Sequence, residues 1–316
     1  MPKESNFKDV IAKFKAKEQQ QALDIRPEAL NKVWNQFHFG TMYALWAEAG
    51  GGKTTLTLQA VRSLLKAGKT GLFIDVEKAF NEQQQETFKL TEFISSGQLV
   101  TVTVSNYKDL EEIVLSLPGS GIDFVVIDSI TAVRPYTKEG IRVEDVRPGI
   151  TSQQQNAVIN QLKDIAYDNN IGVIIIAHAR ANIQMTGFVN RYAPTTKMAG
   201  GYSMYHIPDV ITEITTHSKV KDDEGSVIGV EITIQATKNK WTAPYNPIRE
   251  KLFFGKGISA RLSVIEKAIE LGIISKEGRS LTVPGDDKKY NRKTIYDIPD
   301  NLVKMLNETI KQQTNE

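Results

Sequence analysis

Residues 42–55 read MYALWAEAGGGKTT, and this stretch decides the fold. It begins with six mostly apolar residues and passes through three consecutive glycines. It then continues into TLTLQAVRSLLKAG, where apolar residues recur at helical spacing. A strand, a glycine-rich turn and a helix in this order form a phosphate-binding loop, because backbone N–H groups of the turn and the helix N-terminus all point toward the anion. The stretch predicts an α/β protein with a P-loop.

The residues of this loop point to ATP with magnesium. Lys53 is placed to reach the β and γ phosphates, and the hydroxyl of Thr54 is placed to ligate Mg²⁺. The full loop pattern has glycine where this chain has Ala47, but three consecutive glycines supply the required backbone freedom. A glycine-rich turn without a ligand is the alternative, which the flanking strand and helix disfavour. The residues expected to bind nucleotide are Glu48, Ala49, Gly50, Gly51, Gly52, Lys53, Thr54 and Thr55.

Further apolar runs follow the loop. They are GLFIDV at 71–76, LVTVTV at 99–104, FVVIDSI at 124–130 and GVIIIAHA at 172–179, with helical stretches between them. Continuous apolar strands separated by helices predict a mostly parallel sheet with helices on both faces. Segments 210–218 and 229–240 instead alternate apolar and polar residues, which predicts a hairpin or meander that completes the sheet.

Two carboxylates belong to the same expected site. Asp128 ends an apolar strand, where a carboxylate is placed to hold magnesium through water. Glu77 follows Asp75 by two residues, so both side chains face the same side if the strand continues that far. We predict that Glu77 orients the attacking water, with an ion-paired surface glutamate as the alternative.

The ends of the chain suggest separate units. Phe7, Val10, Ile11 and Phe14 give residues 5–22 one apolar helical face, which predicts an arm that packs on a neighbouring subunit or on its own domain. From residue 259 a helix, a short strand near 280–283 and a final helix predict a small α/β unit. The expected domains are an N-terminal oligomerisation arm over 1–35, an ATPase core over 36–258 and a C-terminal domain over 259–316.

The composition excludes several classes of protein. The 316 residues are 41% hydrophobic and 24% charged, which is typical of a globular protein. The absence of cysteine excludes disulfides and thiolate metal sites. No apolar run approaches the roughly 20 residues that span a membrane, so a cytoplasmic protein is expected.

One basic segment has the composition of a DNA-binding loop. Residues 178–201 carry Arg180, Arg191 and Lys197 without any acidic residue, and they include Phe188 and Tyr192. Cations for phosphates together with aromatic groups for bases suit single-stranded DNA without reading its sequence. An ordinary surface loop is the alternative.

Seven blocks resemble the RecA family of bacterial and phage strand-exchange recombinases, in order and spacing, over roughly residues 40–280. They are AEAGGGKTT, FIDVEKA, FVVIDSITAVRP, IIIAHAR, KMAGGYSMY, ATKNKWTAPY and FFGKGIS. The resemblance implies a RecA-type P-loop NTPase core and a DNA-dependent ATPase that uses ATP and Mg²⁺. It further implies a helical filament of this chain on single-stranded DNA that pairs with double-stranded DNA and exchanges strands in recombination and repair. A single-strand-binding or mediator protein is left open as a partner.

The resemblance also assigns individual residues. It implies that Lys238 and Lys240 reach into the neighbouring subunit's ATP, the alternative being solvated charges at a strand end. His178 stands where bacterial members more often have a glutamine that senses the γ phosphate, with a structural histidine as the alternative. The residues after Ala79 depart from the family pattern, and Asn81 is an adenine-side candidate by its position alone. For DNA the resemblance adds Gly200 and Gly201 in the second loop, Arg142 and Arg147 in a first loop over 134–151, and Lys288, Lys289, Arg292 and Lys293 for duplex, where a solvated loop is an equal alternative.

Two other functions fit a P-loop core. A hexameric helicase-type DNA motor would use the same nucleotide site, but the KNKWTAP block and the long acid-free loop disfavour it. A nucleotide-binding regulatory protein would not need Glu77 as a hydrolytic group. The segment before the P-loop is short beside bacterial members and the C-terminus lacks their acidic tail, both of which are features of a compact, phage-like member.

Overall fold

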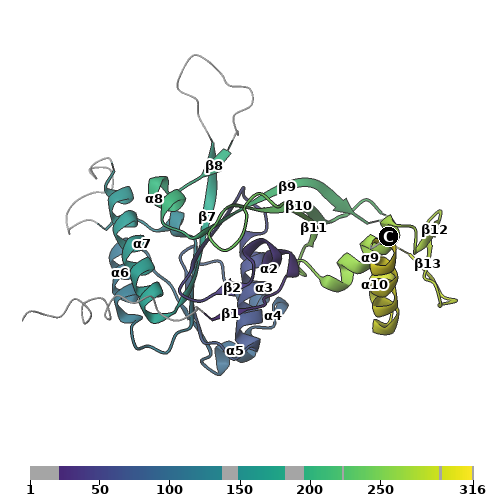
Figure 1. The fold of residues 1–316 in the computed structure, drawn as a ribbon, viewed down its shortest axis with the longest axis horizontal. Helices are drawn as coiled ribbons and strands as arrows, with labels where there is room; N and C mark the ends of the chain where they lie inside the picture. Colours follow the sequence, from purple (N-terminus) through teal and green to yellow (C-terminus); the bar gives the residue numbers. More distant parts are fainter. Residues whose placement is uncertain (1–20, 137–148, 182–195, 223, 292–293, 315–316) are drawn as a thin grey trace, which may run out of the picture.

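The computed structural model describes residues 21–136, 149–181, 196–222, 224–291 and 294–314. Most of its strands form one nine-stranded sheet, shown in Figure 1. The strands of this sheet are β3 (Met42–Ala47), β4 (Gly71–Asp75), β5 (Leu99–Val102), β6 (Phe124–Asp128), β7 (Gly172–Ala181), β8 (Thr196–Met198), β9 (Val210–Lys221), β10 (Val227–Asn239) and β11 (Ile248–Phe253). A small separate pair consists of β1 (Ala22–Leu23) and β2 (Phe37–His38).

The strand order confirms the predicted mostly parallel sheet. The order is β11-β10-β9-β3-β7-β6-β4-β5, with β8 paired to β7. Neighbours from β9 to β5 run parallel, and β10 and β11 add antiparallel strands at one edge. The predicted hairpin over 210–240 is β9 and β10, which are longer than the alternating segments indicated. The carboxyl ends of the parallel strands share one edge of the sheet, where the P-loop follows β3.

Helices cover both faces of the sheet because alternate strand residues point to opposite sides. Leu45 and Ile174 belong to one hydrophobic cluster, and their neighbours Ala44 and Ile175 belong to the other. The first cluster is covered by α2 (Glu28–Trp34), α3 (Lys53–Lys66) and α5 (Thr91–Ser95), with α4 (Glu82–Thr87) beside α5. The second is covered by α6 (Tyr107–Ser116), α7 (Ile150–Asn169) and α8 (Gly201–His206).

The described start of the chain lies against the core. The helix predicted over 5–22 falls mostly outside the described residues, and its last position, Ala22, belongs to β1 instead. Helix α2 was not predicted, and it buries Leu30 and Trp34 completely in the first cluster. The boundary of the arm at residue 35 stays a prediction.

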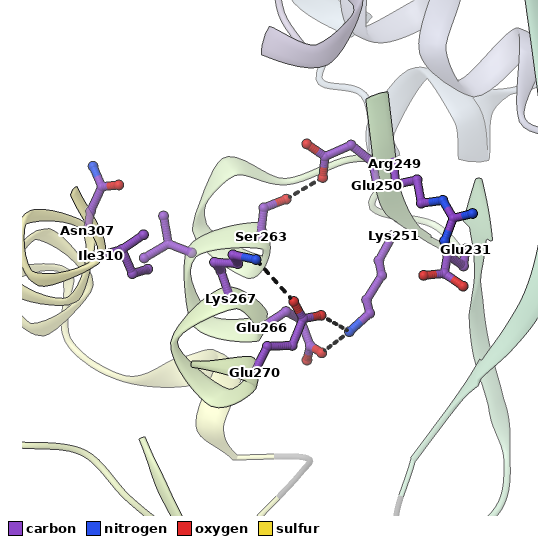
Figure 2. Close-up of a pocket in the computed structure, with 11 residues that line it drawn as sticks. Glu231, Arg249, Glu250, Lys251, Ser263, Glu266, Lys267, Glu270, Asn307 and Ile310 are labelled. Atoms are coloured by element: carbon purple, nitrogen blue, oxygen red, sulfur yellow. Dashed lines mark hydrogen bonds and ion pairs between the residues drawn. The ribbon is translucent and has the colours of Figure 1, made fainter. Parts of the chain in front are cut away.

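The C-terminal residues have a hydrophobic cluster of their own. Its elements are α9 (Ala260–Glu270), β12 (Ser275–Glu277), β13 (Ser280–Thr282), β14 (Lys289–Tyr290) and α10 (Asp300–Thr314). A cavity of about 480 Å³ lies between this unit and β10 and β11. Figure 2 shows Lys251 of β11 crossing the junction to Glu266, at 2.5 Å, and to Glu270, at 3.3 Å. We keep residue 259 as the proposed boundary of this unit.

No helix among the described residues is long and apolar enough to cross a membrane.

Candidate functional site

The turn between β3 and α3 has the backbone that a phosphate-binding loop needs. Gly50 and Gly52 have φ angles of 75° and 82°, in the left-handed region that favours glycine. A Cβ on Gly52 would lie 2.4 Å from a methyl carbon of Leu252, and a Cβ on Gly51 would lie 2.7 Å from the Cβ of Ala47. The methyl group at position 47, where the usual motif has none, is therefore accommodated because position 51 has none.

Lys53 begins α3 and turns its ammonium group back onto the loop. Its Nζ donates to the carbonyl oxygens of Ala47 and Glu48, at 3.1 Å each, and the residue is buried. Burial lowers the pKa of Lys53, while the charges of Asp128 and Glu77 act in the opposite direction. A phosphate oxygen would be a stronger acceptor than these carbonyls, because hydrogen bonds between charged groups are stronger than neutral ones.

Thr54 and Asp128 meet beside Lys53. The Oγ1 of Thr54 donates to Oδ2 of Asp128 at 2.7 Å, and Asp128 is the buried last residue of β6. Burial raises the pKa of Asp128 to about 6, although the hydrogen bond from Thr54 lowers it. A cation would stabilise the charged form of this buried carboxylate. A hydroxyl and a carboxylate side by side are oxygen ligands that fit Mg²⁺.

Glu77 and His178 form a bridge over the end of β6. Strand β6 lies between β4 and β7, and Glu77 follows β4 while His178 lies on β7. Glu77 Oε1 and His178 Nε2 are 2.7 Å apart. Burial acts to raise the pKa of Glu77, but hydrogen bonds from Ser129 and His178 outweigh it, so this pKa lies below its ordinary value. Glu77 is therefore a carboxylate that can accept a hydrogen bond from water.

These groups line one cavity of about 460 Å³ at the carboxyl edge of the sheet. Its lining includes the loop from Ala49 to Thr55, together with Glu77, Asp128 and His178. The structure thus brings together most of the predicted nucleotide site. Glu48 contributes a carbonyl to Lys53 but does not line the cavity.

Two residues that line the cavity were not predicted from the sequence, and one predicted residue does not line it. Leu252 and Phe254 line the cavity, and Phe254 is 53% exposed. Leu252 lies in β11 and Phe254 follows its last residue, about 200 residues after the P-loop. Phe254 belongs to the FFGKGIS block, which could have indicated it, whereas Leu252 lies outside that block. Asn81 is not among the lining residues, since its Oδ1 accepts from the backbone N–H of Gln84 and caps α4.

Lys238 and Lys240 lie at the opposite end of the sheet from the P-loop. Lys238 pairs with Ile211 at the start of β9, and the parallel strand β3 begins beside β9 at this end. Lys238 Nζ donates to the carbonyl of His206 at 2.7 Å, and Lys240 Nζ donates to Asp209 at 2.8 Å. Neither lysine lines the nucleotide cavity of its own chain.

The basic segment after His178 begins as a hairpin, which stands out from the sheet in Figure 1. Strand β7 continues to Ala181 and pairs with β8, so Arg180 stands directly opposite Lys197. Neither has an ion pair with an acidic side chain of the described residues, although like charges opposite each other destabilise a strand pair. Gly200 and Gly201 follow with φ angles of 104° and 68°.

Most of the other predicted DNA contacts lie outside the described residues. Arg142, Arg147, Phe188 and Arg191 lie outside the described residues, as do Tyr192, Arg292 and Lys293. Lys288 and Lys289 are exposed on the C-terminal unit.

Comparison with known proteins agrees with this geometry. The model of the RecA N-terminal domain family matches residues 36–259. Protein RecA of Chloroherpeton thalassium is 25% identical over 256 residues, which cover 81% of this chain and 69% of that protein. Protein RecA of Cytophaga hutchinsonii is 27% identical over 260 residues, which cover 82% and 71%. The crystal structure of the RadB recombinase has a similar fold, with a TM-score of 0.53 and 22% identity over 73% of this chain and 96% of that chain. The chain belongs to the RecA family.

Proposed function

We propose that this chain is a DNA-dependent ATPase that assembles into helical filaments on single-stranded DNA and promotes homologous pairing and strand exchange with duplex DNA. The observation that carries the proposal is the continuity of β7. This one strand holds His178 in the nucleotide cavity and, two residues later, Arg180 in the basic hairpin. A change at the nucleotide is therefore connected to the expected DNA-binding segment by rigid backbone.

The cavity fits ATP and Mg²⁺. Lys53 and the N–H groups of the glycine turn would hold the phosphates, and Thr54 and Asp128 would hold the cation. The half-exposed ring of Phe254 offers a face for the nucleobase at the rim. ATP would supply the phosphoryl group that is transferred to water. Glu77 would orient that water, and His178 would change partner from Glu77 to the γ phosphate.

The separation of the P-loop from Lys238 and Lys240 supports an assembly in which hydrolysis needs two subunits. The six residues of β3 separate these two groups by roughly 20 Å. A head-to-tail contact would bring the lysines of one chain to the cavity of the next, where they would add positive charge at the phosphates. Such a contact produces a helical filament unless its rotation closes a ring. A closed ring would favour the hexameric motor, and electron microscopy with DNA and ATP distinguishes the two.

The first experiment is the rate of ATP hydrolysis with and without single-stranded DNA at two salt concentrations. We expect strong stimulation that weakens with salt, because phosphate contacts release counterions. The variants Arg180→Ala and Lys197→Ala should each lower DNA affinity and reduce the slope of log affinity against log salt by about 1. Lys276→Ala, an exposed lysine of the C-terminal unit, is the matched control. A rate that does not respond to DNA would contradict the proposal and favour a nucleotide-binding regulator.

A further inference from the structure

The carboxyl group of Asp209 lies among three lysines at the end of the sheet opposite the P-loop. Asp209 is only 6% exposed. Its Oδ2 accepts from the backbone N–H of Met42 at 2.9 Å and from Lys163 of α7, and its Oδ1 accepts from Lys240. Burial acts to raise the pKa of Asp209, but these hydrogen bonds outweigh it and keep the pKa below its ordinary value. The group is thus a carboxylate with a fixed position.

The lysines on the two oxygens are held differently. The side chain of Lys163 is 21% exposed, and that of Lys240 is 57% exposed. A buried ion pair is costly to break, whereas an exposed one contributes little net free energy. Lys163 and the Met42 N–H therefore fix Asp209, which orients the ammonium group of Lys240 without trapping it.

Lys238 has a separate support on the same chain segment. Its Nζ donates to the carbonyl of His206 at 2.7 Å and lies 3.5 Å from the carbonyl of Tyr205, at the end of α8. Burial lowers the pKa of Lys238, and the positive charge of Lys240 lowers it further. Two lysines on one carboxylate, together with Lys238, form a surface with excess positive charge.

We propose that Asp209, fixed by Lys163, is a positioning residue that presents Lys240 to the nucleotide of a neighbouring copy of this chain. The inference rests on the proposed function, which assigns Lys240 to that nucleotide. A free lysine side chain loses rotamer freedom when it is fixed at a phosphate, and a lysine that is already held loses less. An ammonium group has three donors, so one hydrogen bond to Asp209 can persist while another reaches the phosphate.

The same segment connects this support to the basic hairpin. Helix α8 begins at Gly201, separated from the end of β8 by two residues, and Asp209 follows the end of α8 by three residues. The carbonyl of Gly200 is anchored by Gln155 of α7 at 2.6 Å. A displacement of β8 on binding DNA would therefore reach both lysine supports through six helical residues.

The test compares full-length variants in DNA-stimulated ATP hydrolysis. Asp209→Asn should lower kcat by about three- to tenfold with little change in KM for ATP, because the phosphate-binding cavity is untouched. Lys240→Ala should lower kcat more. The double variant Asp209→Asn with Lys163→Gln removes both charges of the buried pair. It should show the same loss of kcat with wild-type melting, which separates positioning from misfolding.

Mixing chains identifies where Asp209 acts. The variant Glu77→Gln cannot orient water but keeps Asp209 and Lys240. Adding it in equal amount to Asp209→Asn should raise the rate per Asp209→Asn chain by roughly two- to fivefold. The reason is that half of the Asp209→Asn active sites then face a neighbour with an intact Asp209 and Lys240. Rescue of Lys240→Ala but not of Asp209→Asn would overturn the positioning role and leave the proposed function standing. Unchanged kcat in Asp209→Asn would also overturn it. Full activity of Lys240→Ala would overturn the proposed function itself.

Discussion

Replacing Gly51 by alanine would put a methyl group against that of Ala47. The new Cβ would lie 2.7 Å from the Cβ of Ala47 and 3.1 Å from the carbonyl oxygen of Glu48. Two carbon atoms prefer a separation of about 3.5–4.0 Å, so one of the two residues must move by roughly 1 Å. Crowding of this kind destabilises a packed site by about 1–3 kcal/mol, and we expect about 2 kcal/mol for Gly51→Ala.

The change Ala47→Gly removes the atom that the new methyl group meets. Alone it should destabilise the protein by about 0.5–1 kcal/mol, because glycine loses more backbone freedom on folding than alanine does. Independent effects would add to about 3 kcal/mol. If Ala47 causes the crowding, the double variant should lose only about 1 kcal/mol, which is a coupling free energy of about 2 kcal/mol. The remaining approach to Glu48 limits the recovery.

Thermal unfolding of the wild type, both single variants and the double variant measures this coupling. For a domain of this size, about 2 kcal/mol corresponds to a fall in Tm of roughly 4–8 °C for Gly51→Ala. Affinity for a fluorescent ATP analogue should fall in Gly51→Ala and recover in the double variant, because the displaced turn forms part of the cavity. The packing argument would be refuted if the fall in Tm of the double variant equalled the sum of the falls in the two single variants.

Other predictions concern the switch, the ion cluster and the junction with the C-terminal unit. His178→Gln should keep DNA-stimulated ATP hydrolysis and His178→Ala should lose it, and unchanged stimulation in the alanine variant would contradict the switching role. The folded-state pKa of Asp209 lies below its ordinary value of 3.8, so its stabilising effect is present above pH 3.8 and is lost as the pH falls through the folded-state pKa. The free energy of unfolding, measured with urea, should therefore fall more in wild type than in Asp209→Asn as the pH is lowered from about 5. Equal falls would argue against this ion cluster. Lys251→Met should lower the free energy of unfolding by about 2 kcal/mol. This loss is smaller than that for breaking a fully buried ion pair, because Lys251 is partly exposed. Amide hydrogen exchange should become faster in α9. Unchanged exchange there would show that the pair does not hold α9.

The parts of the fold that could be predicted have local signals in the sequence. The strand runs before Ala47, Asp75 and Asp128 are continuously apolar because both faces of each strand are buried, and the P-loop follows the first of them. A carboxylate at the end of such a strand necessarily reaches the carboxyl edge of the sheet. The predicted site at that edge follows from these two facts together with strand order.

The parts that could not be predicted depend on contacts between distant segments. Leu252 reaches the P-loop from an antiparallel strand whose sequence carries no nucleotide signal. Lys163 and Asp209 are 46 residues apart and look like ordinary charged residues of a helix and a loop. The sequence shows Ala47 only as a departure that neighbouring glycines can tolerate, and the packing identifies Gly51 as the residue that makes room for it.

Strand β11 shows why the nucleotide cavity and the C-terminal unit should respond to each other. Its alternate residues face opposite sides, so Leu252 packs beside Gly52 of the P-loop while Lys251 points to Glu266 of α9 (Figure 2). Phe254 lines both the nucleotide cavity and an adjoining cavity that Tyr296 of the C-terminal unit also lines. A strand with fixed alternation cannot shift Leu252 without moving Lys251, because both are attached to the same hydrogen-bonded backbone. Occupation of the cavity by nucleotide would therefore act on the ion pair with Glu266 through β11, without a direct contact between the C-terminal helices and the phosphates.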